Sequence, residues 1–173
     1  MLIGLKENDF DNMYNILKES FPKAERRTKQ GQKALFKKEC YKVFAIRDND
    51  SCIKAFITVY DLNFFAFVEH FAVSKNYRNQ GLGALVLTEL KKMIKKPVIL
   101  EVEPPDTDMA KRRIEFYKRN GFFLNDYFYE QLPLRKGQSN LTLKIMSSDK
   151  QLSKEEFEDV KRIIYKQVYD YTD

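Results

Sequence analysis

Apolar residues along this chain recur with a period of two in some segments and of about 3.6 in others. Residues 42–46, 53–60 and 65–73 are rich in β-branched and aromatic side chains, and the turn formers at 48–51 separate the first two runs. These runs predict a hairpin followed by a third antiparallel strand. Upstream, residues 1–5 predict a short strand. A helix capped by Asn8 is expected next, and a weaker helix over 29–38.

In the second half of the chain, predicted helices and strands follow one another. Apolar positions between 82 and 94 predict an amphipathic helix that Pro97 ends, followed by a strand at 98–102. The next helix is capped by one of the residues 106–108 and stopped by Asn120-Gly121. Strands are expected at 122–129 and 141–146, and Ser153 with Glu156 forms the capping box of a last helix. The strand–helix–strand unit requires at least one parallel pairing.

These elements predict an α/β fold with a mixed, mostly antiparallel central sheet flanked by helices. A length of 173 residues predicts a single domain, residues 1–173, with its core at about 1–146. The last helix, at about 153–170, is an extension of that core. Its Tyr165 and Tyr169 could cover the sheet or serve a dimer contact, so a homodimer stays open.

Composition excludes several classes of protein. No apolar run approaches the roughly 20 residues that span a bilayer, and the start of the chain turns acidic too soon for a signal peptide. A cytoplasmic location is therefore expected. Cys40 and Cys52 form neither a disulfide framework nor a metal pattern, and no metal site is expected. The net charge of +6 would suit polyanions, but the basic residues are scattered through predicted helices and no nucleic-acid-binding motif is present.

Two glycines stand where a predicted strand gives way to a helix. Gly81 and Gly83 would let the backbone turn sharply and let a ligand approach the first helix amides, which form the positive end of the helix dipole. With Arg78 beside them, this is a phosphate site. The alternative is a turn that only packs the helix on the sheet. The segment is neither a Walker loop nor a G-x-G-x-x-G motif, because no Gly-Lys-Ser/Thr follows and position 86 is Val86.

The spacing Arg78-x-x-Gly81-x-Gly83 resembles the acyl-CoA pyrophosphate loop of the GNAT acetyltransferases. The flanking segments VEHFAVSKNYRNQGLG and RRIEFYKRNGF resemble that family's fourth strand and later helix. The resemblance covers about residues 65–122, and the order of elements fits from residue 1 to 146. One position departs from the pattern: many members have Asn where this chain has Thr107, which removes the basis for a side-chain contact to the cofactor there.

The resemblance implies acetyl-CoA as co-substrate. Main-chain groups of the fourth strand would pair with the pantetheine arm, and a bulge near Ala72 would aim an amide at the thioester oxygen. The pyrophosphate would lie on the loop that follows. The cofactor-binding residues are then Phe71, Ala72, Val73, Arg78, Asn79, Gln80, Gly81, Leu82, Gly83 and Ala84.

Two catalytic residues are implied as well. Tyr117 falls where the family keeps a tyrosine that reaches the CoA sulfur, although its helical spacing would also suit a core residue. Glu69 resembles the glutamate that draws the amine proton through water in polyamine-type members, but it could equally be a solvated or salt-bridged carboxylate. Strand alternation places His70 on the opposite face from Glu69, which favours a packed or surface histidine over a catalytic one.

The expected function is acetyl-CoA-dependent transfer of an acetyl group to a primary amine, by direct attack in a ternary complex. The acceptor would be a small-molecule amine, a peptide N-terminus or a lysine. Residues 25–27 and 131–135 would form the walls of its site. Two other classes stay open: an acyl-CoA-binding regulator without turnover, and a nucleic-acid-binding module.

Overall fold

A computed structural model describes residues 1–171 of the chain. The chain divides into two compact units, Met1–Lys96 and Pro97–Asp173, and each unit is built around its own set of strands. The single catalytic domain expected from the sequence remains a prediction.

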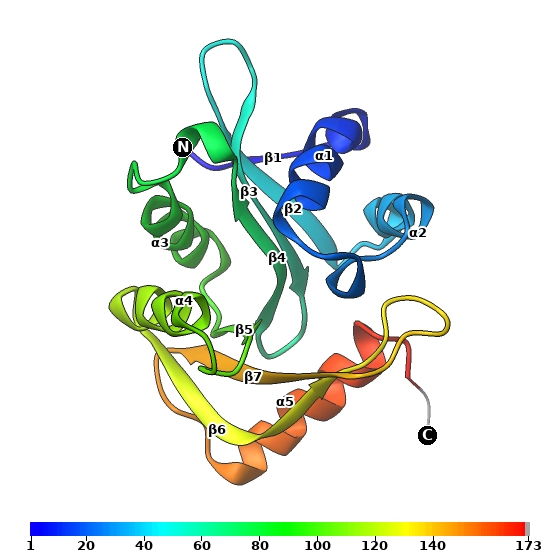
Figure 1. The fold of residues 1–173 in the computed structure, drawn as a ribbon, viewed down its shortest axis with the longest axis vertical. Helices are drawn as coiled ribbons and strands as arrows, with labels where there is room; N and C mark the ends of the chain where they lie inside the picture. Colours follow the sequence, from blue (N-terminus) through cyan, green and yellow to red (C-terminus); the bar gives the residue numbers. More distant parts are fainter. Residues whose placement is uncertain (172–173) are drawn as a thin grey trace. The chain divides into compact units, whose positions relative to one another are not determined.

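Unit 1 contains an antiparallel sheet with the strand order β1-β2-β3-β4 (Figure 1). Its hairpin and third strand confirm the period-two runs. The elements are β1 (Ile3–Gly4), α1 (Phe10–Ser20), α2 (Lys29–Ala34), β2 (Tyr41–Arg47), β3 (Ile53–Asp61), β4 (Ala66–Val73) and α3 (Leu82–Ile94), with short 3₁₀ helices η1 (Glu7–Asp9), η2 (Lys23–Glu25), η3 (Leu35–Lys37) and η4 (Lys75–Tyr77).

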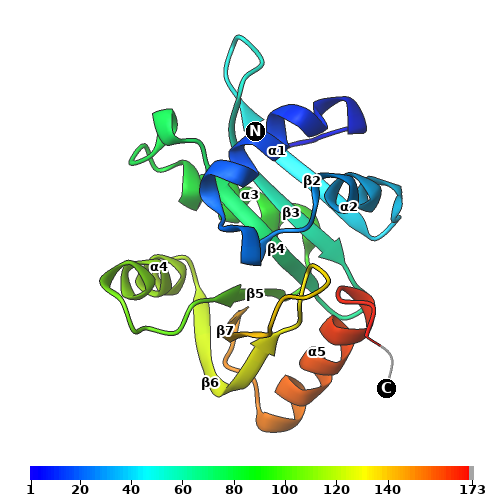
Figure 2. The ribbon, with the colours of Figure 1, turned by 45° about the vertical axis from the view of Figure 1, so that its right-hand side comes forward.

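Helices cover both faces of this sheet. In Figures 1 and 2, α3 lies on the face of β3 and β4 opposite to the one that α1 covers. α1 and α3 each bury an apolar stripe against the strands. The buried positions of these two helices are Phe10, Met13, Tyr14, Leu17, Leu82, Val86, Leu87 and Leu90. The 3.6-residue period read from the sequence is therefore the one that packs the core of unit 1.

The start of α1 differs from the expectation that Asn8 caps it. Asn8 lies inside η1, and the residue before the helix is Asp9, whose side chain forms no cap hydrogen bond. The Asp9 carboxylate instead accepts hydrogen bonds from the Lys6 amide at 3.2 Å and from Arg47 Nη2 at 2.5 Å. An ion pair from a distant strand thus replaces the local cap.

Unit 2 holds the remaining strands in the order β5-β7-β6, and both of these pairings are antiparallel. α4 packs on β5 and β6, and α5 packs on β6. Thr107 caps α4, accepting a hydrogen bond from the Ala110 amide at 3.1 Å, and Ser153 with Glu156 forms the predicted capping box of α5. The elements are β5 (Val98–Val102), α4 (Asp108–Arg119), β6 (Phe122–Gln131), β7 (Leu141–Ser148) and α5 (Lys154–Gln167).

The C-terminal helix is fastened to the strands of unit 2. The Tyr165 hydroxyl donates to the Glu130 carbonyl oxygen at 2.6 Å, and the Tyr169 hydroxyl donates to Glu101 Oε1 at 2.7 Å. Phe157, Val160 and Ile164 of α5 are buried. Of the two roles left open for the tyrosines, the structure therefore shows that they cover the strands.

Candidate functional site

The glycine loop forms as the sequence predicts, between β4 and α3. Gly81 precedes α3 with φ of 74° and ψ of 0°, and Asn79 has φ of 60°. Both residues thus adopt the left-handed conformation that lets the chain reverse direction within a few residues. The strand and the helix are joined by a tight turn that exposes its backbone.

The side of Gly81 where a Cβ would project is open. An added Cβ would meet no atom within 4 Å, so packing does not require glycine here. Within residues 1–171, no side chain caps the first amides of α3. Arg78 is exposed, and its Nε donates to the Val73 carbonyl oxygen at 3.2 Å. A pyrophosphate would therefore find free amides, open space and a cation at one turn, which fits the predicted group.

The predicted pantetheine strand is regular on its β3 side. Phe71, Ala72 and Val73 pair with Ile57, Phe56 and Ala55 in unbroken register. Within this pairing, the expectation of a bulge near Ala72 is wrong.

The irregularity of β4 lies at Glu69 instead. Thr58 faces His70 and Val59 faces Val68, which leaves Glu69 as an extra residue without a partner on β3. Such a bulge switches the phase of side-chain alternation along the strand. The strict alternation that would place Glu69 and His70 on opposite faces is therefore lost at this bulge.

Glu69 is held in a buried ion pair. Its carboxylate pairs with the guanidinium of Arg27, from the segment between η2 and α2, and the two side chains are 1% and 12% exposed. Burial is the largest single effect and raises the pKa of the Glu69 carboxyl, but the interactions with Arg27 and His70 together outweigh it, and the pKa falls to about 2. Of the two interpretations of Glu69, this geometry favours the salt-bridged carboxylate.

His70 is packed, not exposed. Its side chain is 1% exposed, its Nε2 lies 2.7 Å from the carbonyl oxygen of Glu25, and the Phe21 ring meets it edge-on at 4.8 Å. Because a carbonyl only accepts, Nε2 carries the proton of that hydrogen bond. Nδ1 lies 3.4 Å from Glu69 Oε2 without forming a hydrogen bond.

Tyr117 lies on α4 in unit 2 and is 8% exposed. Its ring packs edge-on against Phe116 and Phe122, at 5.3 and 5.6 Å between centroids. Burial raises the pKa of Tyr117 to about 12, against a smaller lowering by Arg113. Its hydroxyl therefore stays protonated at neutral pH, as a proton donor must.

Glu101, the one charged residue of β5, was not among the site residues predicted from the sequence. Its Oε1 accepts hydrogen bonds from the hydroxyls of Tyr129, at 2.5 Å, and Tyr169, at 2.7 Å. Burial, followed by the charge of Glu101, raises the pKa of Tyr129 well above its usual value. The only available signal was a glutamate inside the apolar run VILEV. The geometry gives it a structural role, joining two strands to the C-terminal segment.

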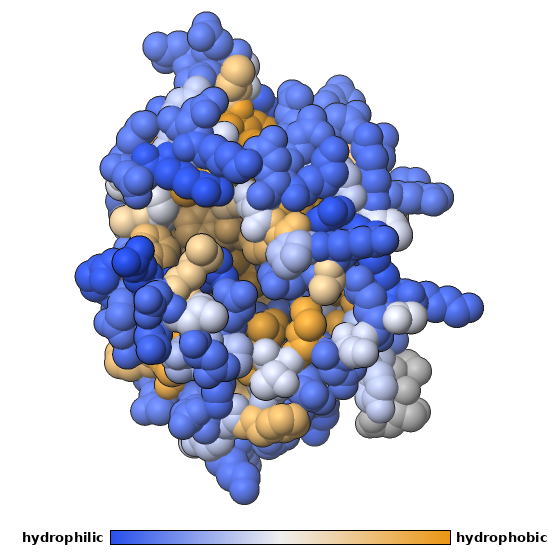
Figure 3. Space-filling view, viewed as in Figure 1, coloured by the Kyte–Doolittle hydropathy of each residue, from blue (hydrophilic) through white to orange (hydrophobic). Residues whose placement is uncertain are grey.

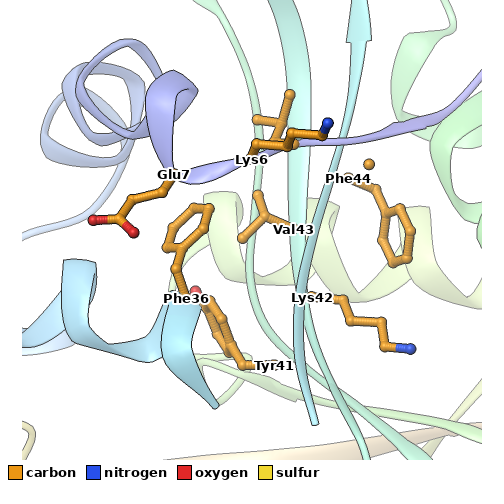
Figure 4. A pocket seen from close by; sticks show the side chains of 9 residues that line it. Lys6, Glu7, Phe36, Tyr41, Lys42, Val43 and Phe44 are labelled. Carbon is orange, nitrogen blue, oxygen red and sulfur yellow. The ribbon is translucent and has the colours of Figure 1, made fainter. Parts of the chain in front are cut away.

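A surface cavity of about 390 Å³ lies beside β2 and is lined by none of the site residues described above (Figure 4). Phe36, Tyr41 and Val43 form its apolar wall, and Lys6 and Lys42 also line it. No predicted catalytic or cofactor-binding residue lines this cavity.

The part of the chain described, residues 1–171, contains no group of three or more His, Cys, Asp or Glu that could hold a metal ion. Every helix in that range is too short or too polar to traverse a bilayer. Cys40 and Cys52 are free thiols.

Comparison with known proteins agrees with this geometry. Residues 10–122 match the model of the Acetyltransferase (GNAT) family. The chain is 32% identical over 165 residues to "Putative acetyltransferase YjbC" of Bacillus subtilis (strain 168), covering 94% of this chain and 83% of that protein.

Solved structures give the same result. One described as "Putative acetyltransferase from GNAT family from Bacteroides thetaiotaomicron" superposes with a TM-score of 0.91 at 31% identity, over 99% of each chain. The ribosomal-protein-S18-alanine N-acetyltransferase of Escherichia coli shares the fold, with a TM-score of 0.65 at 21% identity over 90% of this chain and 96% of that one.

The fold and the glycine loop thus define an acyltransferase class. The chain belongs to the GNAT acetyltransferase family. This result confirms both the resemblance seen in the sequence and the predicted mixed α/β fold with a mostly antiparallel sheet.

Proposed function

We propose that the protein is an acetyl-CoA-dependent N-acetyltransferase that acts on a primary amine by direct attack in a ternary complex. The observation that carries this proposal is the turn at Gly81. Open space lies where a Cβ of this residue would project, and no side chain of residues 1–171 caps the first amides of α3, which follows the turn. Family membership supports acetyl transfer.

In this proposal, unit 1 binds acetyl-CoA. The amides of residues 79–84 and the guanidinium of Arg78 hold the pyrophosphate, because unsatisfied helix amides and a permanent cation both favour an anion. Main-chain groups of Phe71, Ala72 and Val73 align the pantetheine arm as an added strand. Bound in this way, acetyl-CoA supplies an activated thioester.

In the transfer, the amine nitrogen bonds to the thioester carbon and the carbon–sulfur bond breaks. The amine loses one proton and the departing sulfur gains one, so the reaction is balanced without another reagent. We propose that the Tyr117 hydroxyl donates a hydrogen bond to the departing sulfur. Its raised pKa keeps that proton in place at the pH of the reaction.

We propose that Glu69 keeps its ion pair with Arg27 during the reaction and that solvent accepts the amine proton. A carboxylate with a pKa of about 2 is a weak base, because a general base works best with a pKa near the operating pH. The alternative, in which Glu69 takes the proton through a water molecule, predicts a pH profile that the Glu69→Gln variant would change.

The acceptor is a small-molecule amine, a peptide N-terminus or a lysine in this proposal. The cytoplasmic location and a homodimer remain predictions from the sequence. The second candidate function is an acyl-CoA-binding regulator, which would share the loop but produce no free CoA. Release of free thiol from acetyl-CoA with a broad panel of amines separates these two functions.

The loop assignment has a matched test. Gly81→Ala and Gly137→Ala both place a Cβ at a left-handed residue, with φ of 74° and 82°, and both project it into open space. Each should lose about 1 kcal/mol of stability from backbone strain. Only Gly81→Ala should weaken acetyl-CoA binding, by about tenfold or more in calorimetry, since its Cβ would enter the phosphate site. Equal affinities of the two variants for acetyl-CoA would show that the pyrophosphate does not bind at this turn.

A further inference from the structure

The carboxylate of Glu69 forms an ion pair with a cation of the same chain. Arg27 pairs with it across 42 residues of sequence, and both side chains lie almost entirely out of solvent. Glu69 also stands two residues before Phe71, the first residue of the proposed pantetheine strand. The carboxylate nearest to that strand in the sequence is therefore neutralised before any substrate arrives.

Further contacts hold the segment that carries Arg27. His70 Nε2 donates to the Glu25 carbonyl oxygen at 2.7 Å, and the Phe21 ring rests edge-on against the His70 imidazole. Both contacts join the segment before Arg27 to the bulged part of β4. Arg27 is thus a fixed cation, unlike a surface lysine whose charge moves freely through solvent.

The surroundings of Arg27 are also basic. Residues 23–38 hold seven Lys or Arg and a single acidic residue, an excess equal to the net charge of +6 of the whole chain. Lys29 and Lys33 reach Asp11 and Glu7, at 2.6 and 3.6 Å, and so are partly compensated. In Figure 3 the side chains over α1 and α2, at the upper right, are mostly hydrophilic. The segment that carries Arg27 is therefore basic.

We infer that Arg27 sets the charge selectivity of the acceptor site: it occupies the carboxylate that a second ammonium group would need, so the acceptor is an amine on a neutral or anionic body. This inference rests on the proposed function, since it concerns the amine of that reaction. The Arg27–Glu69 pair carries no net charge to attract a second ammonium group, so a polycationic amine would meet only the excess positive charge of residues 23–38. An anionic body would be attracted by the same charges.

Three amines of similar length test this selectivity, because they differ in the charge at the far end: cadaverine is cationic, pentylamine neutral and δ-aminovalerate anionic. In the wild type, kcat/KM should be highest for δ-aminovalerate and lowest for cadaverine, with about tenfold between them. Arg27→Gln removes the cation that neutralises Glu69 and should shrink or reverse this gap. Glu69→Gln removes the carboxylate that offsets the charge of Arg27 and should widen it.

Opposite shifts in these two variants are the decisive result, because a purely structural defect would move all three amines together. The control is Arg47→Gln, which removes an ion pair with Asp9 in the same unit and should leave the order of the amines unchanged. If Arg27→Gln does not fold, Glu69→Gln carries the test, because this variant keeps the guanidinium of Arg27 and loses only the carboxylate that offsets it.

Binding of the same amines, followed by NMR on the Glu69 and His70 amides, separates this inference from the proposed function. The predicted order of affinities without acetyl transfer would keep the inference and overturn the function. Transfer with cadaverine as the best wild-type acceptor would keep the function and overturn the inference, and so would parallel shifts in Arg27→Gln and Glu69→Gln.

Discussion

Replacing Arg27 by methionine should destabilise the protein in a way that depends on pH. Methionine retains an apolar stem of similar reach, so the change mainly removes the guanidinium. Glu69 would stay about 1% exposed without its cation. Removal of one partner from a buried ion pair costs about 3–5 kcal/mol, because an uncompensated charge remains inside.

The sign of the pH dependence distinguishes this cause from loss of packing. In the wild type the pKa of Glu69 is lowered from its usual 4.5 to about 2. Its stabilisation is complete above pH 4.5 and is lost as the pH falls toward 2, at up to about 1.4 kcal/mol per unit. Without Arg27, only His70 opposes the raising effect of burial, and we expect this pKa to rise above its usual 4.5. The folded variant then binds more protons than the unfolded chain, so its stability rises as the pH falls from 7 toward 4.5.

Urea denaturation followed by circular dichroism, at pH 7 and pH 5, measures both effects. The deficit of Arg27→Met should shrink at pH 5 by about 1–3 kcal/mol, and adding Glu69→Gln should recover most of it at pH 7. Arg47→Met is the matched control. Its pair with Asp9 is more exposed, at 19% and 28%, and should cost only about 1 kcal/mol. An Arg27→Met deficit as small as this, with the wild-type pH dependence, would refute the buried pair.

Three further predictions follow from the site and from unit 2. Tyr117→Phe keeps the ring packing and should lower kcat about tenfold or more in a thiol-release assay with little change in acetyl-CoA affinity, whereas an unchanged kcat would make Tyr117 a core residue. Glu69→Gln should leave the acidic limb of the kcat/KM pH profile in place, and its disappearance would restore the general-base role. Tyr169→Phe removes the hydrogen bond to Glu101 and should cost about 1–2 kcal/mol in urea denaturation, while a neutral result would show that this hydrogen bond does not stabilise the protein.

Local chemistry explains which parts of the fold could be predicted. Thr107 and the Ser153–Glu156 pair cap α4 and α5 as expected, because each cap involves residues only three apart. The turn at Gly81 was also predictable, since its left-handed backbone favours glycine and the hydrophobic period changes on either side of it. The parallel pairing implied by the strand–helix–strand unit stays a prediction.

The failures have a common cause in distant partners. Asn8 does not cap α1, because it lies inside η1, and the carboxylate of Asp9, the residue before the helix, is bonded to Arg47, 38 residues away. Glu101 could be recognised only once Tyr129 and Tyr169 were seen to meet at it, 28 and 68 residues away in sequence. No periodic pattern records such pairs. A charged residue inside an apolar strand was the sole signal, and it does not identify its partner.

The bulge at Glu69 shows most clearly why the site could not be laid out from the sequence. In an unbroken strand, His70 and Ala72 would share a face with Val68. With Glu69 as the extra residue, His70 and Ala72 face Thr58 and Phe56, and the phase of every later residue changes relative to Val68. A bulge depends on the register of two strands, so it leaves no trace in either strand alone. This one switch carries His70 to the Glu25 carbonyl and leaves Glu69 beside Arg27. It thereby turns a residue that the sequence offers as a possible base into the partner of a fixed cation.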